Sequence, residues 1–261
     1  MKHHHFVLLH GACHGAWSWY KLKHRLELAG HCVTVLDLAA SGTDTKSIHD
    51  IRTFREYTEP LLELMASLGA HERVILVGLS LGGLNLALAA DRFPEKISVA
   101  VFLAAFMPDT AHRPSYVLEE YCARAPEGAW LDTQFEPIGQ PDKPLTSMFF
   151  GPDFLSSKLY QLSPLEDLEL GKILTRPGSL FLEDLSTSSN FTCKGYGSTT
   201  RVYVVCRQDV GIPLGFQRWM IANGGAHHVL EVDGADHMAM LSKPQELCDC
   251  LLEIGAKYVG A

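Results

Sequence analysis

The sequence lacks the features that mark several classes of protein. Its longest apolar runs are no longer than a strand, which predicts that no helix crosses a membrane. The His and Cys residues do not show the spacing of a zinc site, and we expect no metal. The net charge of −8 argues against binding to nucleic acid or to an anionic membrane surface. Internal repeats and low-complexity tracts are also missing.

We also expect no export signal. The first five residues lead directly into an apolar run at Phe6, which leaves no room for a signal peptide. The cysteines are odd in number and scattered, which is typical of reduced thiols. We therefore expect a cytoplasmic protein. The seven cysteines are Cys13, Cys32, Cys122, Cys193, Cys206, Cys248 and Cys250.

What the sequence does contain is an alternation of buried strands with amphipathic helices. Strands are predicted at 6–10, 32–36, 73–77, 97–105, 201–206 and 228–232. Helices are predicted at 17–29, 53–68, 83–90, after Pro213, and at 244–258. Strands that are apolar throughout and alternate with helices indicate a mostly parallel sheet covered on both faces. With 261 residues, 47% of them hydrophobic, the chain can form a single α/β domain over 1–261.

Residues 106–181 interrupt this alternation. The stretch is rich in proline, and its aromatic residues are distributed among short segments. Long connections without structure are uncommon in compact domains and often serve as lids. We interpret 106–181 as a cap inserted over the edge of the sheet; the alternative is a long irregular connection.

The segment Gly78-Leu79-Ser80-Leu81-Gly82 carries the strongest chemical signal. It follows an apolar run and precedes a predicted helix, so a serine stands at the tip of a strand–turn–helix, the nucleophile elbow. Gly78 and Gly82 would allow the strand and the helix to pass closely without a Cβ clash. The alternative is a glycine-rich turn whose serine has no role.

A serine hydroxyl needs a base to take its proton, and the base needs an acid to fix its tautomer. In elbow folds the three residues follow the chain order Ser, Asp or Glu, His. Ser80, Asp209 and His237 satisfy this order. Asp209 and His237 each follow the carboxyl end of a predicted strand, where open α/β sheets place their ligands.

Other acids and histidines compete for these roles. Glu183 and Asp184 do not follow a strand, and Asp236 is adjacent to His237 and cannot easily fold back onto its ring. His10 and His14 lie near the site, but His10 ends a buried strand and is interpreted as a structural, hydrogen-bonded histidine.

Acyl transfer also requires donors for a developing oxyanion. The backbone N–H of Leu81, directly after the nucleophile, supplies one. The loop after the first strand supplies the other, and we assign it to the N–H of Ala12. Gly11 leaves room for a substrate carbonyl beside it. The alternative is that this loop is a plain strand-to-helix turn.

These segments together resemble the plant α/β-hydrolase family of methylesterases and hydroxynitrile lyases. The resemblance covers nearly the whole chain, and the salicylate and alkaloid esterases of the family are the most similar. The segments that show this resemblance are 6–17, 36–42, 102–109, 176–181 and 234–240. The resemblance implies an α/β-hydrolase fold, a Ser/Asp/His triad, no metal, no organic cofactor and a homodimer.

The resemblance also implies a substrate pocket for a small aromatic or terpenoid acyl group. The alternative from composition is that these apolar residues are cap core. The implied pocket residues are Phe106, Tyr121, Trp130, Met148, Phe150, Leu180 and Met238, and Gly11, assigned above from its position, completes the predicted pocket.

Two positions separate the family's chemistries. The resemblance implies that lyases cleaving cyanohydrins have threonine in place of Gly11 and lysine in place of Met238, so lyase activity is not favoured here. Leu79 departs from the family, in which esterases have histidine and lyases glutamate. It could be packed beneath the elbow, or it could mark a specialised activity, a weakened activity or an engineered chain.

The leading hypothesis is a serine carboxylesterase that hydrolyses methyl esters of small plant acids through an acyl-enzyme. The acids could be salicylate-, jasmonate-, indoleacetate- or alkaloid-like. A hydroxynitrile lyase-type C–C lyase is one alternative. A salicylate-like small-molecule binding protein with low turnover is the other.

Overall fold

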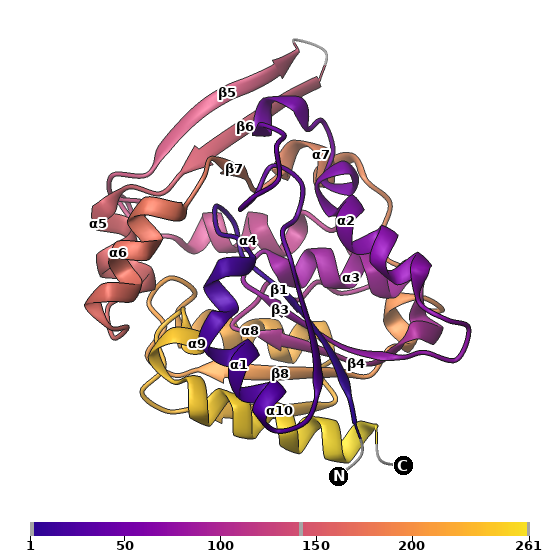
Figure 1. Cartoon of the computed structure of the whole chain (residues 1–261). Coiled ribbons are helices and arrows are strands. Elements are labelled where there is room, and N and C mark those ends of the chain that lie inside the picture. The colour runs from indigo at the N-terminus through magenta and orange to yellow at the C-terminus, as the bar shows by residue number, and fades with distance from the viewer. Residues whose placement is uncertain (1–2, 141–142, 260–261) are drawn as a thin grey trace.

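The computed structural model describes residues 3–140 and 143–259. Six strands form one parallel sheet in the order β2-β1-β3-β4-β8-β9 (Figure 1). Their apolar side chains are buried in β3, β4 and β8, as expected for strands covered on both faces. The strands are β1 (His5–Leu9), β2 (Cys32–Leu36), β3 (Val74–Leu79), β4 (Ile97–Leu103), β8 (Arg201–Cys206) and β9 (His228–Val232).

The predicted strands and helices are present, with small shifts at their ends. Strand β4 stops before Ala104, because that residue has a left-handed φ of 38° that ends the extended backbone. The predicted helix at 17–29 is divided into a 3₁₀ turn, η1 (Ala16–Trp19), and α1 (Tyr20–Leu28). The other predicted helices are α2 (Phe54–Ser67), α3 (Gly82–Arg92), α8 (Leu214–Gly224) and α10 (Pro244–Tyr258).

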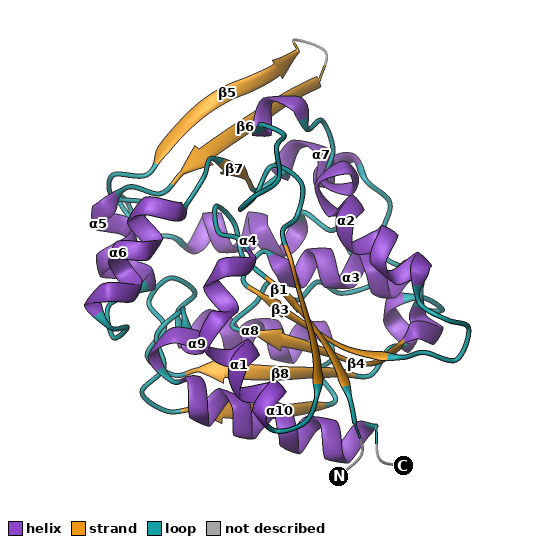
Figure 2. Ribbon diagram, in the orientation of Figure 1, coloured by secondary structure: helices purple, strands orange, loops and turns teal. Residues whose placement is uncertain are grey.

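Helices cover both faces of the sheet (Figure 2). A Cβ placed on Gly255 of α10 would lie 3.3 Å from Ile75, whereas one on Gly83 of α3 would lie 3.1 Å from Phe102. Phe102 pairs with Gly78, three residues beyond Ile75, so the two side chains point to opposite faces. The mostly parallel, doubly covered sheet predicted from the sequence is therefore confirmed.

Residues 106–181 contain more regular structure than the sequence indicated. Two antiparallel strands, β5 (Gln134–Gln140) and β6 (Lys143–Phe149), extend away from the main sheet, and β7 (Gly178–Ser179) adds to β6 (Figure 1). This ladder was not predicted because Pro137 and Pro144 lie inside its strands. Pro137 lies in the edge strand β5, and Pro144 lies in the part of β6 that β7 does not pair, and proline is tolerated at such edges. The helices here are α4 (Tyr116–Arg124), α5 (Pro152–Phe154), η4 (Leu155–Leu159) and α6 (Leu165–Leu174), and α7 (Leu182–Thr187) follows.

The sheet brings four chain segments together at its carboxyl edge. Ser80 follows β3 directly, and the 10–12 segment follows β1. Asp209 lies three residues beyond β8, and His237 lies five residues beyond β9. Within the described ranges, no helix has the length and apolarity needed to cross a membrane.

Candidate active site

Ser80 occupies a strained turn between β3 and α3. Its φ of 55° lies in the left-handed region, which is uncommon for a residue other than glycine and is seen at functional sites. A Cβ on Gly78 would lie 2.5 Å from the carbonyl oxygen of Gly82, and one on Gly82 would lie 2.8 Å from that of His10. Both glycines are therefore required for the close passage, as the elbow motif predicts.

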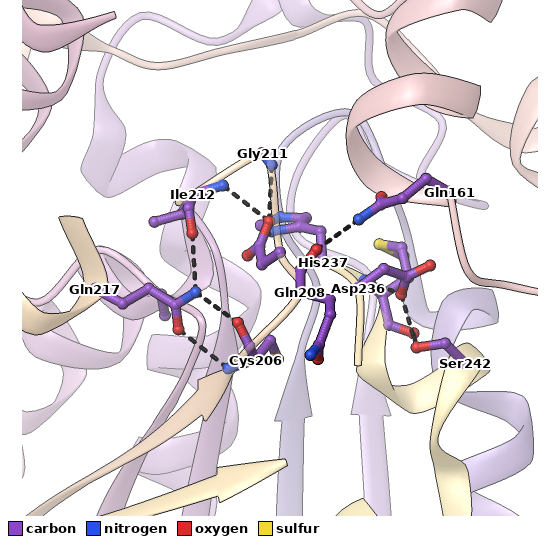
Figure 3. A network of polar contacts seen from close by, with 12 residues as sticks. Gln161, Cys206, Gln208, Gly211, Ile212, Gln217, Asp236, His237 and Ser242 are labelled. Carbon is purple, nitrogen blue, oxygen red and sulfur yellow. Dashed lines mark hydrogen bonds and ion pairs between the residues drawn. The ribbon is translucent and has the colours of Figure 1, made fainter. Parts of the chain in front are cut away.

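Asp209 is buried and uses both carboxylate oxygens. Its Oδ1 accepts hydrogen bonds from the backbone N–H groups of Gly211 and Ile212, at 2.8 and 2.9 Å (Figure 3). Its Oδ2 lies 2.8 Å from Nδ1 of His237. The loop thus fixes the carboxylate, and the carboxylate fixes the imidazole.

The surroundings of His237 favour its protonated form. Burial by itself lowers the pKa of the ring, but the charge and hydrogen bond of Asp209 and the charge of Asp236 outweigh this effect. The pKa of His237 is therefore raised above 6.5. An imidazole held this way can accept a proton and remain stabilised as a cation, which is what a general base must do.

The rival acids have other partners. Asp236 is fully buried, and its two oxygens accept four hydrogen bonds. The bond from Ser242 is drawn in Figure 3. Glu183 accepts a bond from Thr146, and Asp184 accepts one from the backbone of Phe54. The donors to Asp236 are Leu162 N, Ser163 Oγ, Met238 N and Ser242 Oγ.

Two backbone N–H groups near Ser80 are available to a ligand. Among the described residues, no protein acceptor lies within hydrogen-bond range of the N–H of Ala12 or of Leu81. A Cβ on Gly11 would lie 2.9 Å from Cβ of Ser80, so the loop after β1 approaches the serine as closely as glycine allows. Buried N–H groups usually donate to a hydrogen-bond acceptor. Two such groups without a protein acceptor, beside a serine, therefore fit an oxyanion site.

Two histidines near the site are held by the backbone. Nδ1 of His10 donates to the carbonyl of Gly11 at 2.8 Å, and its Nε2 accepts from the N–H of Leu38 at 3.1 Å. The structural interpretation of His10 is confirmed by these contacts. Nδ1 of His14 donates to the carbonyl of Ala12 at 2.9 Å, and its Nε2 accepts from the Tyr160 hydroxyl at 2.7 Å. Burial lowers the pKa of His14 to about 3, so this ring stays neutral.

Ser80 and His237 line one apolar cavity. It leaves about 40 Å³ free to the centres of water-sized molecules. The structure brings to its wall every pocket residue predicted from the sequence: Gly11, Phe106, Tyr121, Trp130, Met148, Phe150, Leu180 and Met238. Ala12 and Leu81 line it too.

Six further residues of the wall were not assigned to the pocket from the sequence: His14, Leu79, Phe154, Leu159, Gly211 and Ile212. Gly211 and Ile212 could have been inferred from their position directly after Asp209. Phe154 and Leu159 carry no local signal, because only the packing of 106–181 brings them here. Leu79 is almost fully buried and faces this cavity.

No metal centre is formed by the part of the chain that the structure describes. Within residues 3–140 and 143–259, no three His, Cys, Asp or Glu side chains are grouped as metal ligands. All seven cysteines are free thiols.

Comparison with known proteins defines the class to which this fold and site belong. The model of the alpha/beta hydrolase family matches residues 6–249, and the chain belongs to this family. It is 63% identical to salicylic acid-binding protein 2 of Nicotiana tabacum over 97% of this chain and 98% of that protein. It is 58% identical to methylesterase 1 of Arabidopsis thaliana over 98% of this chain and 97% of that protein.

The same relationship is seen among solved structures. A crystal structure of polyneuridine aldehyde esterase matches with a TM-score of 0.95 and 50% identity, covering 97% of this chain and 100% of that one. The family and fold predicted from the sequence are therefore confirmed. The class is confirmed as well, and the chain is a carboxylic ester hydrolase.

Proposed function

We propose that the protein hydrolyses methyl esters of small, largely apolar plant acids with Ser80 as nucleophile. One observation carries the proposal: the strained Ser80 lines the same apolar cavity as His237, the histidine that Asp209 holds. The names of the similar methylesterases support the methyl ester as the reacting group. Salicylate-, jasmonate-, indoleacetate- and alkaloid-like acids are the candidates for the acyl part.

The reaction follows from the roles of the site residues. Ser80 Oγ attacks the ester carbonyl while Nε2 of His237 takes its proton, and Asp209 stabilises the resulting imidazolium. The N–H groups of Ala12 and Leu81 donate to the oxyanion of the tetrahedral intermediate. His237 then protonates the departing methanol and leaves an acyl-enzyme. A water activated by His237 releases the acid and restores Ser80.

Residues 106–181 act, in this proposal, as a cap that closes the cavity over Ser80. The support is that Trp130, Met148, Phe150 and Leu180 of this segment line the cavity. Gln161 adds a hydrogen bond from the cap to the carbonyl of Gln208, beside Asp209 (Figure 3). Excluding water in this way strengthens the electrostatic interactions inside the site.

A low-turnover binding protein for a salicylate-like acid is the second candidate. The name of salicylic acid-binding protein 2, the 63% identical relative, favours it.

We also propose that the protein is located in the cytoplasm, which the seven free thiols support. The homodimer implied by the family resemblance stays a prediction.

Ser80→Ala tests the proposal. The panel is methyl salicylate, methyl jasmonate, methyl indoleacetate, an alkaloid methyl ester and mandelonitrile. We expect kcat for the best ester to fall by at least about a thousandfold, as when a triad nucleophile is removed. Ser67→Ala, at the exposed end of α2, is the matched control. Undiminished hydrolysis in Ser80→Ala would refute the mechanism, and cyanide release from mandelonitrile would favour the lyase alternative.

A further inference from the structure

A second, larger cavity lies beside the catalytic one. It is a groove of about 490 Å³, within the range of ligand pockets, formed by α4, the loop after β8 and the end of η4. Tyr121 and Gly211 line both cavities and form part of the wall between them. The Tyr121 hydroxyl donates to the carbonyl of Gly211 at 2.6 Å, which fixes this wall.

The inside of the groove is apolar and unfilled. Val210, Pro213 and Phe216 line it, and the side chain of Val210 is 44% exposed. A Cβ added to Gly215, at the start of α8, would meet no atom within 4 Å. An apolar ligand could therefore bury this surface without displacing protein atoms, which favours binding.

The charged side chains that line the groove are both cationic, Arg124 and Lys158, and no Asp or Glu lines it. In the described part of the chain, Lys158 has no carboxylate within ion-pair distance, whereas Arg124 is paired with Glu120 at 2.6 Å. The whole chain carries a net charge of −8. Against this negative background, the cationic side chains of the groove can attract an anion locally.

We propose that this groove is a second binding site, for a small apolar carboxylate whose charge pairs with Lys158. The choice of ligand rests on the proposed function, since ester hydrolysis next to the groove converts a neutral ester into such an anion. Lys158 distinguishes the acid from its ester, because only the acid carries a charge. The ligand would contact Val210 and Gly211, and the N–H of Gly211 holds Asp209, so the occupied groove adjoins the triad.

The test uses benzoate as probe and neutral benzamide as its uncharged analogue. Amide signals of Val210 and Gly215 report the groove by NMR, and those of Leu81 and His237 report the catalytic cavity. We expect benzoate to shift the groove signals in a saturable way and benzamide to leave them in place. Lys158→Gln should weaken groove binding about threefold to fivefold, as for a partly exposed ion pair. Gly215→Leu should abolish it by filling the groove.

Lys172→Gln is the matched control, because it removes the same charge from a lysine paired with Glu169 outside the groove. Shifts confined to Leu81 and His237 would overturn the proposal, as would equal binding of benzamide or an unchanged affinity in both Lys158→Gln and Gly215→Leu. Ester hydrolysis is measured separately, so failure of the methylesterase proposal would not be mistaken for failure of the groove.

Discussion

Nδ1 of His237 lies 2.8 Å from Oδ2 of Asp209, and both side chains are buried. The second oxygen of Asp209 is held by two backbone N–H groups, so the carboxylate cannot rotate without losing them. The imidazole therefore has a fixed tautomer, with its proton on Nδ1 and Nε2 as the acceptor.

Asp209→Asn should lower kcat for the best ester by about 10⁴-fold, because an amide can hold the wrong histidine tautomer. Steady-state kinetics with purified protein measures this change. Asp233→Asn, on an exposed residue of the loop that leads to His237, is the control and should leave kcat within a factor of about two. A fall of less than about tenfold in Asp209→Asn would contradict the role of Asp209 as the orienting acid.

The pH dependence of kcat/KM should show an acid limb above pH 6.5. The base must be neutral to accept a proton, so activity falls as the pH drops through the pKa of His237. Because that pKa is raised above 6.5, the loss of activity begins at a higher pH than for an unperturbed histidine. A pH profile of methyl ester hydrolysis measures the limb. A midpoint at or below 6.5 would contradict the raised pKa.

Asp236→Asn should lower the free energy of unfolding by about 2–4 kcal/mol. The variant replaces one acceptor oxygen with an NH₂ group that faces other donors, and buried unpaired donors are costly. Urea unfolding measures the change. Asp249→Asn, on an exposed face of α10, should change stability by less than about 0.5 kcal/mol. Equal stability of the two variants would show that the four bonds to Asp236 add little.

Leu180→Ala should shift selectivity toward esters with larger acyl groups. Trp130, Met148 and Leu180 separate the catalytic cavity from a third cavity of about 190 Å³. Shortening Leu180 connects the two spaces, so the ratio of kcat/KM for a large against a small methyl ester should rise about tenfold. Leu182→Ala changes only the outer cavity and is the control. A ratio that moves equally in both variants would contradict this wall.

Local sequence determined the nucleophile elbow and the candidate residues of the triad. The elbow was predictable because the run before Gly78, the two glycines and the following helix each constrain the backbone around Ser80. The order Ser80, Asp209, His237 and the positions of the last two after strands were enough to select them. The pocket residues in 106–181 came from the family resemblance, not from periodicity.

Tertiary structure decided the rest. The order of the residues selects Asp209 as the candidate acid, but its 2.8 Å contact with His237 and the four donors that hold Asp236 depend on the loop conformations after β8 and β9. The places of Phe154 and Leu159 in the cavity wall and the groove at Lys158 depend on how 106–181 packs on the sheet. Propensities and motif spacing act over a few residues, whereas the cavities are formed by side chains far apart in the sequence, from Gly11 to Met238 in the catalytic cavity and from Tyr121 to Phe216 in the groove. Only folding brings them together.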